Sequence, residues 1–185
     1  MIIASTRPGR VGKPVGAWFH GLAREQGRFD VRLADLADFD LPIFNEPHHP
    51  RLQKYQYEHT KRWAESVDAA DAYVFVVPEY NYGPTPALLN ALNYLYNEWC
   101  YKPAGFVSYG GISGGIRSVQ MTKLTLTTLK VMPMVEQVAI PMVSQLIEGD
   151  TFQPTEQHER GATMMLDELQ RWAEALAPMR RGKSA

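Results

Sequence analysis

Three short segments of the sequence combine residue types that bind small polar molecules. The first, residues 5–12 (STRPGRVG), brings two hydroxyl side chains, two arginines and two glycines to the start of a helical pattern. Backbone N–H groups at a helix N-terminus attract anions, and hydroxyl and guanidinium donors add to this attraction. The segment therefore suits a phosphate group, although a tight Pro-Gly turn with solvated arginines explains it equally well when taken alone. The candidate phosphate ligands are Ser5, Thr6, Arg7, Arg10, Val11 and Gly12.

Other phosphate-binding motifs do not match this segment. A Walker loop needs two glycines five residues apart, followed by Lys and then Ser or Thr. Here Gly9 and Gly12 are too close together, and Pro14 stands where the hydroxyl residue belongs. The G-x-G-x-x-G dinucleotide motif is absent. A cysteine phosphatase would carry an arginine six residues after its cysteine, but Cys100 is followed at that distance by Phe106.

The second segment, residues 78–86 (PEYNYGPTP), carries two tyrosines, an amide and a carboxylate in a loop stiffened by prolines. Flat apolar surface with hydrogen-bonding groups at its edge is what a planar heterocycle needs. The tyrosines could equally cover the edge of a sheet. The candidate ring contacts are Pro78, Glu79, Tyr80, Asn81, Tyr82 and Gly83.

The third segment, residues 109–115 (YGGISGG), has four glycines, which let backbone approach a ligand closely and donate N–H groups. A glycine-rich loop alone is weak evidence, but three such segments at neighbouring strand ends fit a bound mononucleotide. The candidate ligands here are Gly110, Gly111, Ser113, Gly114 and Gly115.

The residues between these segments predict alternating strands and helices. The expected strands are residues 1–5, 29–36, 72–77, 104–109 and 134–140. The expected helices begin near Pro14 and Thr85 or span residues 57–70, 116–129 and 157–179. Residues 39–55 and 141–154 are expected to be loops. The first strand is short for a central one, and the sequence leaves open whether residues precede Met1.

This alternation predicts an α/β fold, with one parallel sheet between two layers of helices. Five strands favour the order 2-1-3-4-5, and a length of 185 residues favours a single domain over residues 1–185. Ligands of such sheets bind beyond the carboxyl ends of the strands, near the point where the order reverses. The three segments follow the first, third and fourth strands, so we expect them to form one site.

Composition restricts the function further. Nineteen Lys and Arg against twenty Asp and Glu give a net charge of −1, which gives no electrostatic support for binding nucleic acid or anionic membranes. A single cysteine excludes an internal disulfide, no signal-peptide pattern opens the chain, and the apolar runs are too short to span a membrane. We therefore expect a cytoplasmic protein.

The three segments also carry a family resemblance. The sequences STRPGR, PEYNYG-x-x-PALLNAL and YGGISGGIR resemble the NADPH-dependent FMN reductase family, which has the flavodoxin-like fold and includes quinone, azo and chromate reductases. The resemblance implies a flavodoxin-like three-layer sandwich with non-covalent FMN. Its phosphate would lie at residues 5–12 and its ring against residues 78–83 and 110–115. It also implies a homodimer or tetramer.

Two departures from the family pattern stand out. Many members have a second hydroxyl residue late in the phosphate loop, where this chain has Val11 and Gly12, so backbone or Arg10 would supply that contact. Many also have Lys and Asp in the helix where this chain has Leu89 and Asn93, which bears on subunit contacts.

The resemblance implies an enzyme that passes electrons from NADPH or NADH through FMN to a quinone, flavin, azo compound or metal oxyanion. If the nicotinamide and the acceptor use the same face of the flavin in turn, the mechanism is ping-pong. No catalytic acid or base is needed, because the cofactor carries the chemistry. Arg117 is a candidate for attracting the extra phosphate of NADPH, and equally a solvated helix residue or a subunit contact. His48 and His49 lack the spacing of a metal site.

The alternative is a flavin-bound electron carrier or redox sensor that a partner protein reduces. Carriers of this fold are usually strongly acidic and have a Thr-rich phosphate loop, whereas this chain is near neutral and its loop carries arginines. Apolar residues in the loop 39–55, together with Tyr94, Tyr96 and Trp99, predict self-association as at least a homodimer.

Overall fold

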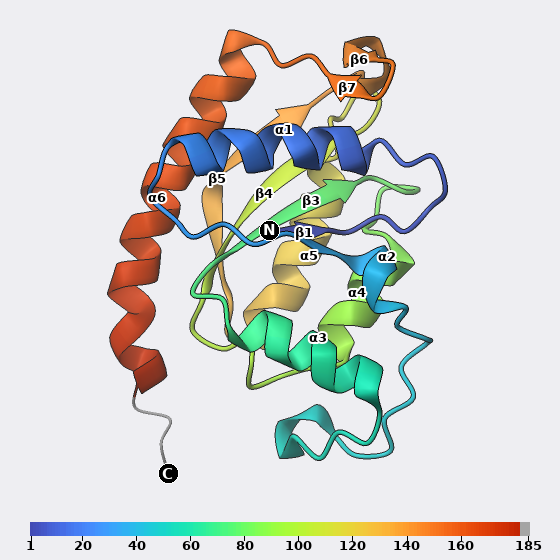
Figure 1. The fold of residues 1–185 in the computed structure, drawn as a ribbon, viewed down its shortest axis with the longest axis vertical. Coiled ribbons are helices and arrows are strands. Elements are labelled where there is room, and N and C mark those ends of the chain that lie inside the picture. Colours follow the sequence, from blue (N-terminus) through green and yellow to red (C-terminus); the bar gives the residue numbers. More distant parts are fainter. Residues whose placement is uncertain (182–185) are drawn as a thin grey trace.

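The computed structural model describes residues 1–181, which form a five-stranded parallel sheet in the predicted order β2-β1-β3-β4-β5 (Figure 1). The strands of this sheet are β1 Ile2–Ile3, β2 Ala34–Asp35, β3 Tyr73–Pro78, β4 Pro103–Tyr109 and β5 Met132–Ile140. The flavodoxin-like fold is confirmed by this strand order and by the layers of helices on the two faces.

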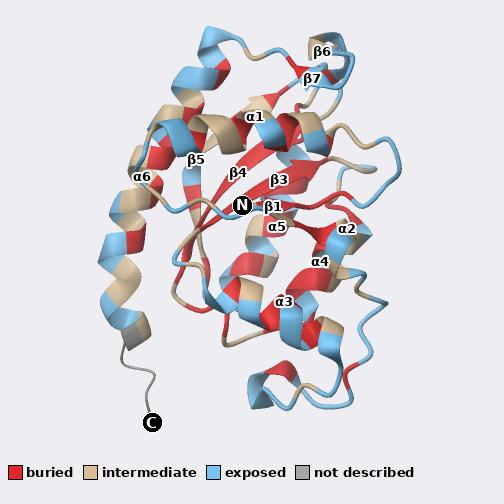
Figure 2. Cartoon of the chain, viewed as in Figure 1, coloured by how far each residue is buried: buried red, intermediate tan, exposed pale blue. Residues whose placement is uncertain are grey.

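Two helices cover one face of the sheet and three cover the other (Figure 1). The helices α1 Gly12–Glu25 and α6 Glu156–Arg181 share one face, whereas α3 Glu58–Asp68, α4 Pro86–Asn93 and α5 Ile116–Thr128 share the other. Residues of β3 alternate between the two cores, with Phe75 facing α3 to α5 and Val76 facing α1 and α6. Because both faces are covered, every residue of β3 is buried, as the continuous apolar run predicts (Figure 2).

The second strand is shorter than predicted. Residues 29–36 are expected to be a strand, but only Ala34–Asp35 pairs with β1, and the chain turns at once into α2 Leu36–Phe39. The Asp35 side chain accepts a hydrogen bond from the Ala37 N–H at 3.1 Å and so caps that helix. The alternating pattern predicts a strand over residues 29–36. A hydrogen-bonded strand forms only where β1 lies beside it, which is at Ala34–Asp35.

The two predicted loops contain short regular elements. The loop 39–55 holds a 3₁₀ turn at Pro50–Leu52, and the stretch 141–154 holds another at Val143–Leu146 followed by a hairpin of β6 Ile147–Glu148 and β7 Thr151–Phe152. The first loop is attached to α4, since Asn90 Nδ2 donates to Pro42 O at 2.6 Å. It is therefore a packed surface segment.

Two aromatic residues expected on the surface are in the core. Tyr94 and Trp99 are fully buried, and the Tyr94 hydroxyl donates to Pro42 O at 3.0 Å. The prediction of an exposed aromatic helix end is wrong at these two positions. The loop 39–55 folds over Tyr94, whereas Trp99 packs against Trp63 of α3 and Tyr73 of β3. Within residues 1–181, no helix is both long and apolar enough to cross a membrane.

Candidate functional site

The three candidate segments meet at the carboxyl ends of β1, β3 and β4, as the strand order requires. Ser5, fully buried at the end of β1, has its hydroxyl oxygen 3.0 Å from that of Tyr80, which follows β3. Thr85 joins the same two segments, since its hydroxyl donates to Ala4 O at 2.7 Å and accepts from Leu88 N–H at 3.1 Å. The first two segments are therefore held in a fixed relation by buried hydrogen bonds.

Residues 5–12 form an open loop that leads into the N-terminus of α1. Gly9 turns the chain with a φ of +67°, and Val11, the N-cap of the helix, makes no side-chain capping hydrogen bond. The first N–H groups of a helix have no partner within it, so their donors and the positive end of the helix dipole are available to an anion. Thr6 and Arg7 are exposed beside this position.

Gly12 lies where a side chain would collide with the end of β4. A Cβ atom there would be 2.7 Å from the Tyr109 hydroxyl oxygen and 3.3 Å from Cγ2 of Ile3. That hydroxyl is buried, and burial raises its pKa. The Ser5 hydroxyl lies close by, but the Tyr109 hydroxyl makes no hydrogen bond of regular geometry with the residues described. A buried hydroxyl without a partner beside an anion-binding loop is suited to donate to a ligand. Tyr109 opens the third segment, but the sequence analysis does not include it among the candidate ligands.

The two arginines of the loop have different surroundings. Arg10 is largely buried and its guanidinium forms an ion pair with Asp35 at the end of β2. Arg7 is exposed, with its guanidinium carbon 5.9 Å from the centre of the Tyr80 ring. Arg10 therefore anchors the loop to the sheet, whereas Arg7 is placed to reach a ligand. Asp35 was also missed; its signal was an acidic residue at the carboxyl end of the second strand.

The second segment ends in a tight turn. Tyr80 and Gly83 exchange two backbone hydrogen bonds of 2.9 Å, and the residues between them, Asn81 and Tyr82, have φ values of +49° and +70°. This is the backbone pattern of a type I′ turn, which is unusual for a tyrosine. The Tyr82 side chain is 65% exposed at the tip. The turn thus presents an aromatic ring on a stiff backbone.

A buried carboxylate joins the second and third segments. Glu79 accepts hydrogen bonds from the Ser113 hydroxyl at 2.8 Å, the Arg117 backbone N–H at 3.2 Å and Arg117 Nε at 2.7 Å. Burial raises the pKa of Glu79, but the hydrogen bonds from Arg117 and Ser113 outweigh burial and hold the pKa below its usual value. The Arg117 guanidinium also lies 3.9 Å from the centre of the Tyr82 ring. We call Glu79, Ser113, Arg117 and Tyr82 the latch.

The latch gives Arg117 a partner that the sequence did not reveal. The alternatives expected for Arg117 are a contact to the extra phosphate of NADPH, a solvated helix position and a subunit contact. In the structure, its guanidinium forms an ion pair with Glu79 and lies over the Tyr82 ring. Arg117 and Glu79 are 38 residues apart, so no local sequence pattern indicates that they pair.

The third segment has a buried base and an exposed tip. Gly114 and Gly115 are buried with φ values of +60° and +82°, and Ser108 donates to Gly114 O at 2.8 Å. Gly111 and Ile112 are exposed at the tip. A ligand would therefore meet the tip and the open N–H groups there, while Gly114 and Gly115 support the loop from below.

In the part of the chain that the structure describes, no three His, Cys, Asp or Glu residues gather as metal ligands would. The site consists instead of an anion-binding loop (the anion cradle), residues 5–12 at the N-terminus of α1, beside two further loops. The second segment presents aromatic side chains, and the third presents backbone N–H groups.

Comparison with known proteins decides the family. A family model described as NADPH-dependent FMN reductase matches residues 1–145. The chain belongs to this family. An NAD(P)H-dependent FMN reductase from Nectria sp is 33% identical over 150 residues, covering 78% of this chain and 75% of that protein. One from Schizosaccharomyces pombe is 34% identical over 152 residues, covering 80% and 76%.

A solved structure with the same fold is that of FerB, a flavoenzyme NAD(P)H:(acceptor) oxidoreductase from Paracoccus denitrificans. It matches with a TM-score of 0.73 and 21% identity over 94% of this chain and 95% of FerB. As a member of the NADPH-dependent FMN reductase family, this chain is an oxidoreductase that works with FMN and NAD(P)H. The observed site fits FMN in two respects, since the cradle at α1 can take its phosphate and the unpartnered Tyr109 hydroxyl can donate to it.

Proposed function

We propose that this FMN reductase binds FMN at the three segments and transfers electrons from NAD(P)H to quinone, flavin, azo or metal-oxyanion acceptors by a ping-pong mechanism. The observation that carries the proposal is the meeting of an anion cradle with two loops of ring-contacting character at one end of the sheet. FMN, when bound, supplies the capacity to take up two electrons from a nicotinamide and pass them on. The protein supplies binding, orientation and shielding from water.

Each segment then has a separate task. Ser5, Thr6, Arg7 and the backbone of Val11 and Gly12 would hold the phosphate, with the dipole of α1 adding to the attraction. Residues 78–83 and 110–115 would contact the ring, and the latch fixes the distance between these two loops. Backbone N–H groups near Asn81 and Gly111 would stabilise negative charge on the ring.

The open edge of the site suggests that nicotinamide and acceptor use one face in turn. The side chains at the two loop tips, Tyr82 and Ile112, are 65% and 92% exposed, so both tips are accessible to a flat molecule. One shared position requires NAD(P)⁺ to leave before the acceptor enters, which is the basis of the ping-pong proposal.

Two measurements test this function. The protein with bound FMN should lose its visible absorbance when mixed with NADPH or NADH without oxygen, and a quinone should restore it within one turnover. Steady-state rates should give parallel double-reciprocal lines as both substrates are varied. Intersecting lines would contradict the shared position. Failure of both nicotinamides to bleach the protein would favour the electron carrier or redox sensor.

We expect Arg7→Ala to weaken FMN binding roughly 10- to 100-fold, the loss of one charge-assisted hydrogen bond to phosphate. The matched variant Arg10→Ala should lower stability more than affinity, because it leaves the buried Asp35 carboxylate without its partner. Fluorescence titration with FMN and urea unfolding measure the two effects. Wild-type affinity in both variants would place the phosphate elsewhere.

We also propose that the protein forms at least a homodimer. Tyr94 and Trp99 are buried and cannot contribute to a subunit interface. Other apolar side chains are exposed, namely Met121 and Leu124 of α5 at 51% and 75% and Ile43 of the loop 39–55 at 90%. Light scattering at micromolar concentration should therefore give about 42 kDa, twice the 20.9 kDa of one chain. A mass of one chain would contradict the proposal.

A further inference from the structure

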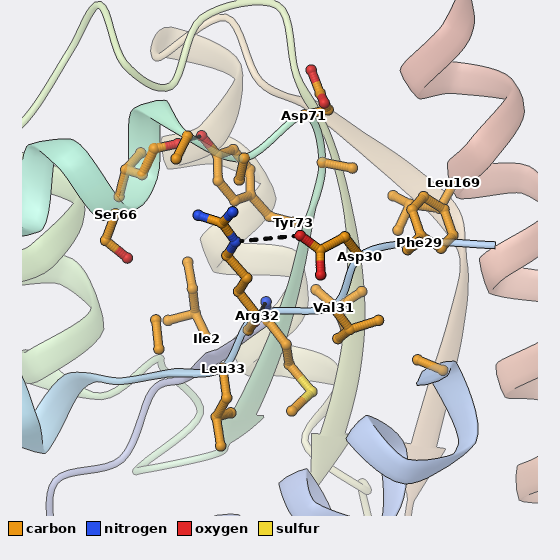
Figure 3. Close-up of a pocket in the computed structure, with 18 of the residues that line it drawn as sticks. Ile2, Phe29, Asp30, Val31, Arg32, Leu33, Ser66, Asp71, Tyr73 and Leu169 are labelled. Carbon is orange, nitrogen blue, oxygen red and sulfur yellow. Dashed lines mark hydrogen bonds and ion pairs between the residues drawn. The ribbon is translucent and has the colours of Figure 1, made fainter. Parts of the chain in front are cut away.

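A flat substrate needs contacts near the three segments, and the cavity of about 480 Å³ in Figure 3 does not supply them. This cavity lies at the amino ends of β1 and β3, where Ile2 and Tyr73 line it. The three segments lie at the carboxyl ends of β1, β3 and β4, at the opposite end of the sheet. Contacts to a flat substrate therefore come from side chains of the segments themselves. Among their tyrosines, Tyr109 is buried, Tyr80 is half-buried and Tyr82 is exposed.

Tyr82 has a backbone conformation that a tyrosine rarely adopts. Its φ is +70°, at the third position of the turn in which Tyr80 and Gly83 exchange two hydrogen bonds of 2.9 Å. A type I′ turn favours glycine at this position, because a Cβ atom at positive φ crowds the neighbouring backbone. Burial does not offset this cost, since the Tyr82 side chain is 65% exposed. The stability of the turn alone therefore does not explain a tyrosine here, and such strained positions cluster where proteins hold ligands.

The Tyr82 ring is held from one side. The guanidinium carbon of Arg117 lies 3.9 Å from the centre of the ring. Arg117 Nε in turn donates to the buried Glu79 carboxylate at 2.7 Å, and the Ser113 hydroxyl donates to the same carboxylate at 2.8 Å. The stack on Arg117 fixes the ring, and the exposure of the side chain shows that the opposite face is open to solvent. Tyr82 thus presents one fixed flat face where the second and third segments meet.

We propose that this free face of Tyr82 is the platform on which flat aromatic substrates of the enzyme stack, and that it favours planar acceptors such as quinones over compact ions. The inference rests on the proposed function, since it places the substrates beside FMN at the three segments. Stacked aromatic rings attract each other beyond the effect of buried area. Because the stack on Arg117 already fixes the Tyr82 ring, little conformational freedom is lost when a second ring binds.

Shape separates the acceptors that this platform recognises from those that it does not. A quinone or an azo compound has a planar π-system that can lie parallel to the Tyr82 ring. A tetrahedral oxyanion or an octahedral metal complex has no flat face and gains nothing from the platform. Tyr82 is thus a specificity-determining residue. Its removal should change the discrimination between the two kinds of acceptor, whereas the loss of a merely structural residue would affect both kinds equally.

The test compares Tyr82→Gly and Tyr82→Ala in the full chain loaded with FMN. Both variants remove the ring, so the ratio of kcat/KM for 1,4-naphthoquinone to kcat/KM for hexacyanoferrate(III), an octahedral ion, should fall roughly 2- to 12-fold. Tyr82→Phe keeps the ring and should keep the parent ratio. Tyr82→Gly should melt about 2–4 °C above Tyr82→Ala, because only alanine retains a Cβ atom at the positive φ.

A second readout needs no turnover. Oxidised FMN and naphthoquinone exchange no electrons, because both are already oxidised. Titration of the oxidised protein with naphthoquinone, followed by the flavin absorbance, therefore measures binding alone. The dissociation constant should rise by the same factor of roughly 2 to 12 in Tyr82→Gly and Tyr82→Ala.

An unchanged acceptor ratio together with an unchanged dissociation constant would overturn the proposal. An equal loss with both acceptors would also overturn it, because that is the result if the ring serves only the flavin or a second subunit. Light scattering of the variants separates these two cases. Failure of NAD(P)H to bleach the parent protein would contradict the proposed function alone, because titration of the oxidised protein still decides whether Tyr82 binds flat rings.

Discussion

Replacing Gly115 by alanine is expected to destabilise the fold by about 3 kcal/mol and to abolish tight FMN binding. The residue has a φ of +82°, and a Cβ atom would lie 2.9 Å from both the backbone N and the backbone O of Tyr109. Those atoms belong to β4, which pairs with strands on both sides and cannot move away. The variant must therefore distort the base of the third segment. Urea unfolding and FMN titration measure the two losses.

Gly111→Ala is the matched control in the same loop. A Cβ atom at Gly111 would have nothing within 4 Å, and its φ is not positive. Its stability should therefore stay within about 0.5 kcal/mol of the parent, as for most exposed substitutions. A Gly115→Ala protein as stable as Gly111→Ala would show that the third segment is not built as the structure has it.

Glu79→Ala is expected to weaken FMN binding by more than roughly 10-fold and to cost about 2–3 kcal/mol of stability. The carboxylate is buried and accepts hydrogen bonds from Ser113 and Arg117, so its removal detaches the second loop from the third. Arg117→Ala should cost less, because its side chain is 49% exposed and solvent screens the ion pair. Glu79→Gln keeps the shape of the side chain and loses its charge. Its stability cost should lie between those of Glu79→Ala and Arg117→Ala.

The latch also has a defined pH dependence. The folded-state pKa of Glu79 is lowered below its usual value, mainly because the hydrogen bonds from Arg117 and Ser113 outweigh burial. The Glu79 carboxylate therefore contributes fully to the free energy of unfolding at pH values above its pKa in the unfolded chain. This contribution is lost as the pH falls through its pKa in the folded protein. The stability difference between the parent and Glu79→Ala should accordingly shrink below about pH 4. A stability difference between the parent and Glu79→Ala that does not change with pH would contradict the role of the latch in stability. Unchanged FMN affinity in Glu79→Ala would contradict its role in holding the two loops.

Segments with strong local signals were predicted closely. The apolar run 72–77 became β3 Tyr73–Pro78, and the amphipathic pattern 157–179 became α6 Glu156–Arg181. The periodicity of a helix and the continuous apolar character of a buried strand are properties of neighbouring residues, so one sequence suffices to find them. The strand order followed because a five-stranded alternating pattern leaves few arrangements.

Contacts between distant residues could not be predicted in this way. The ion pair of Arg10 with Asp35 and the latch depend on which strand ends meet and on which way each side chain turns. We expect Trp99 on the surface as part of an aromatic helix end, but Trp63 of α3 and Tyr73 of β3 cover it. Burial by side chains that are distant in the sequence leaves no periodic pattern around the covered residue, so the sequence alone does not predict it.

The hydroxyl of Thr85 has one more consequence. It holds the carbonyl just before Ser5 and caps α4 at the same time, so the phosphate loop and α4 share one buried attachment. Leu89 lies on the outer side of α4 and is 36% exposed. If a second subunit packs there, an adjustment of α4 is transmitted to the cofactor loop. Thermodynamic linkage then requires reciprocity, in that FMN changes the subunit association constant by the same factor by which association changes the affinity for FMN.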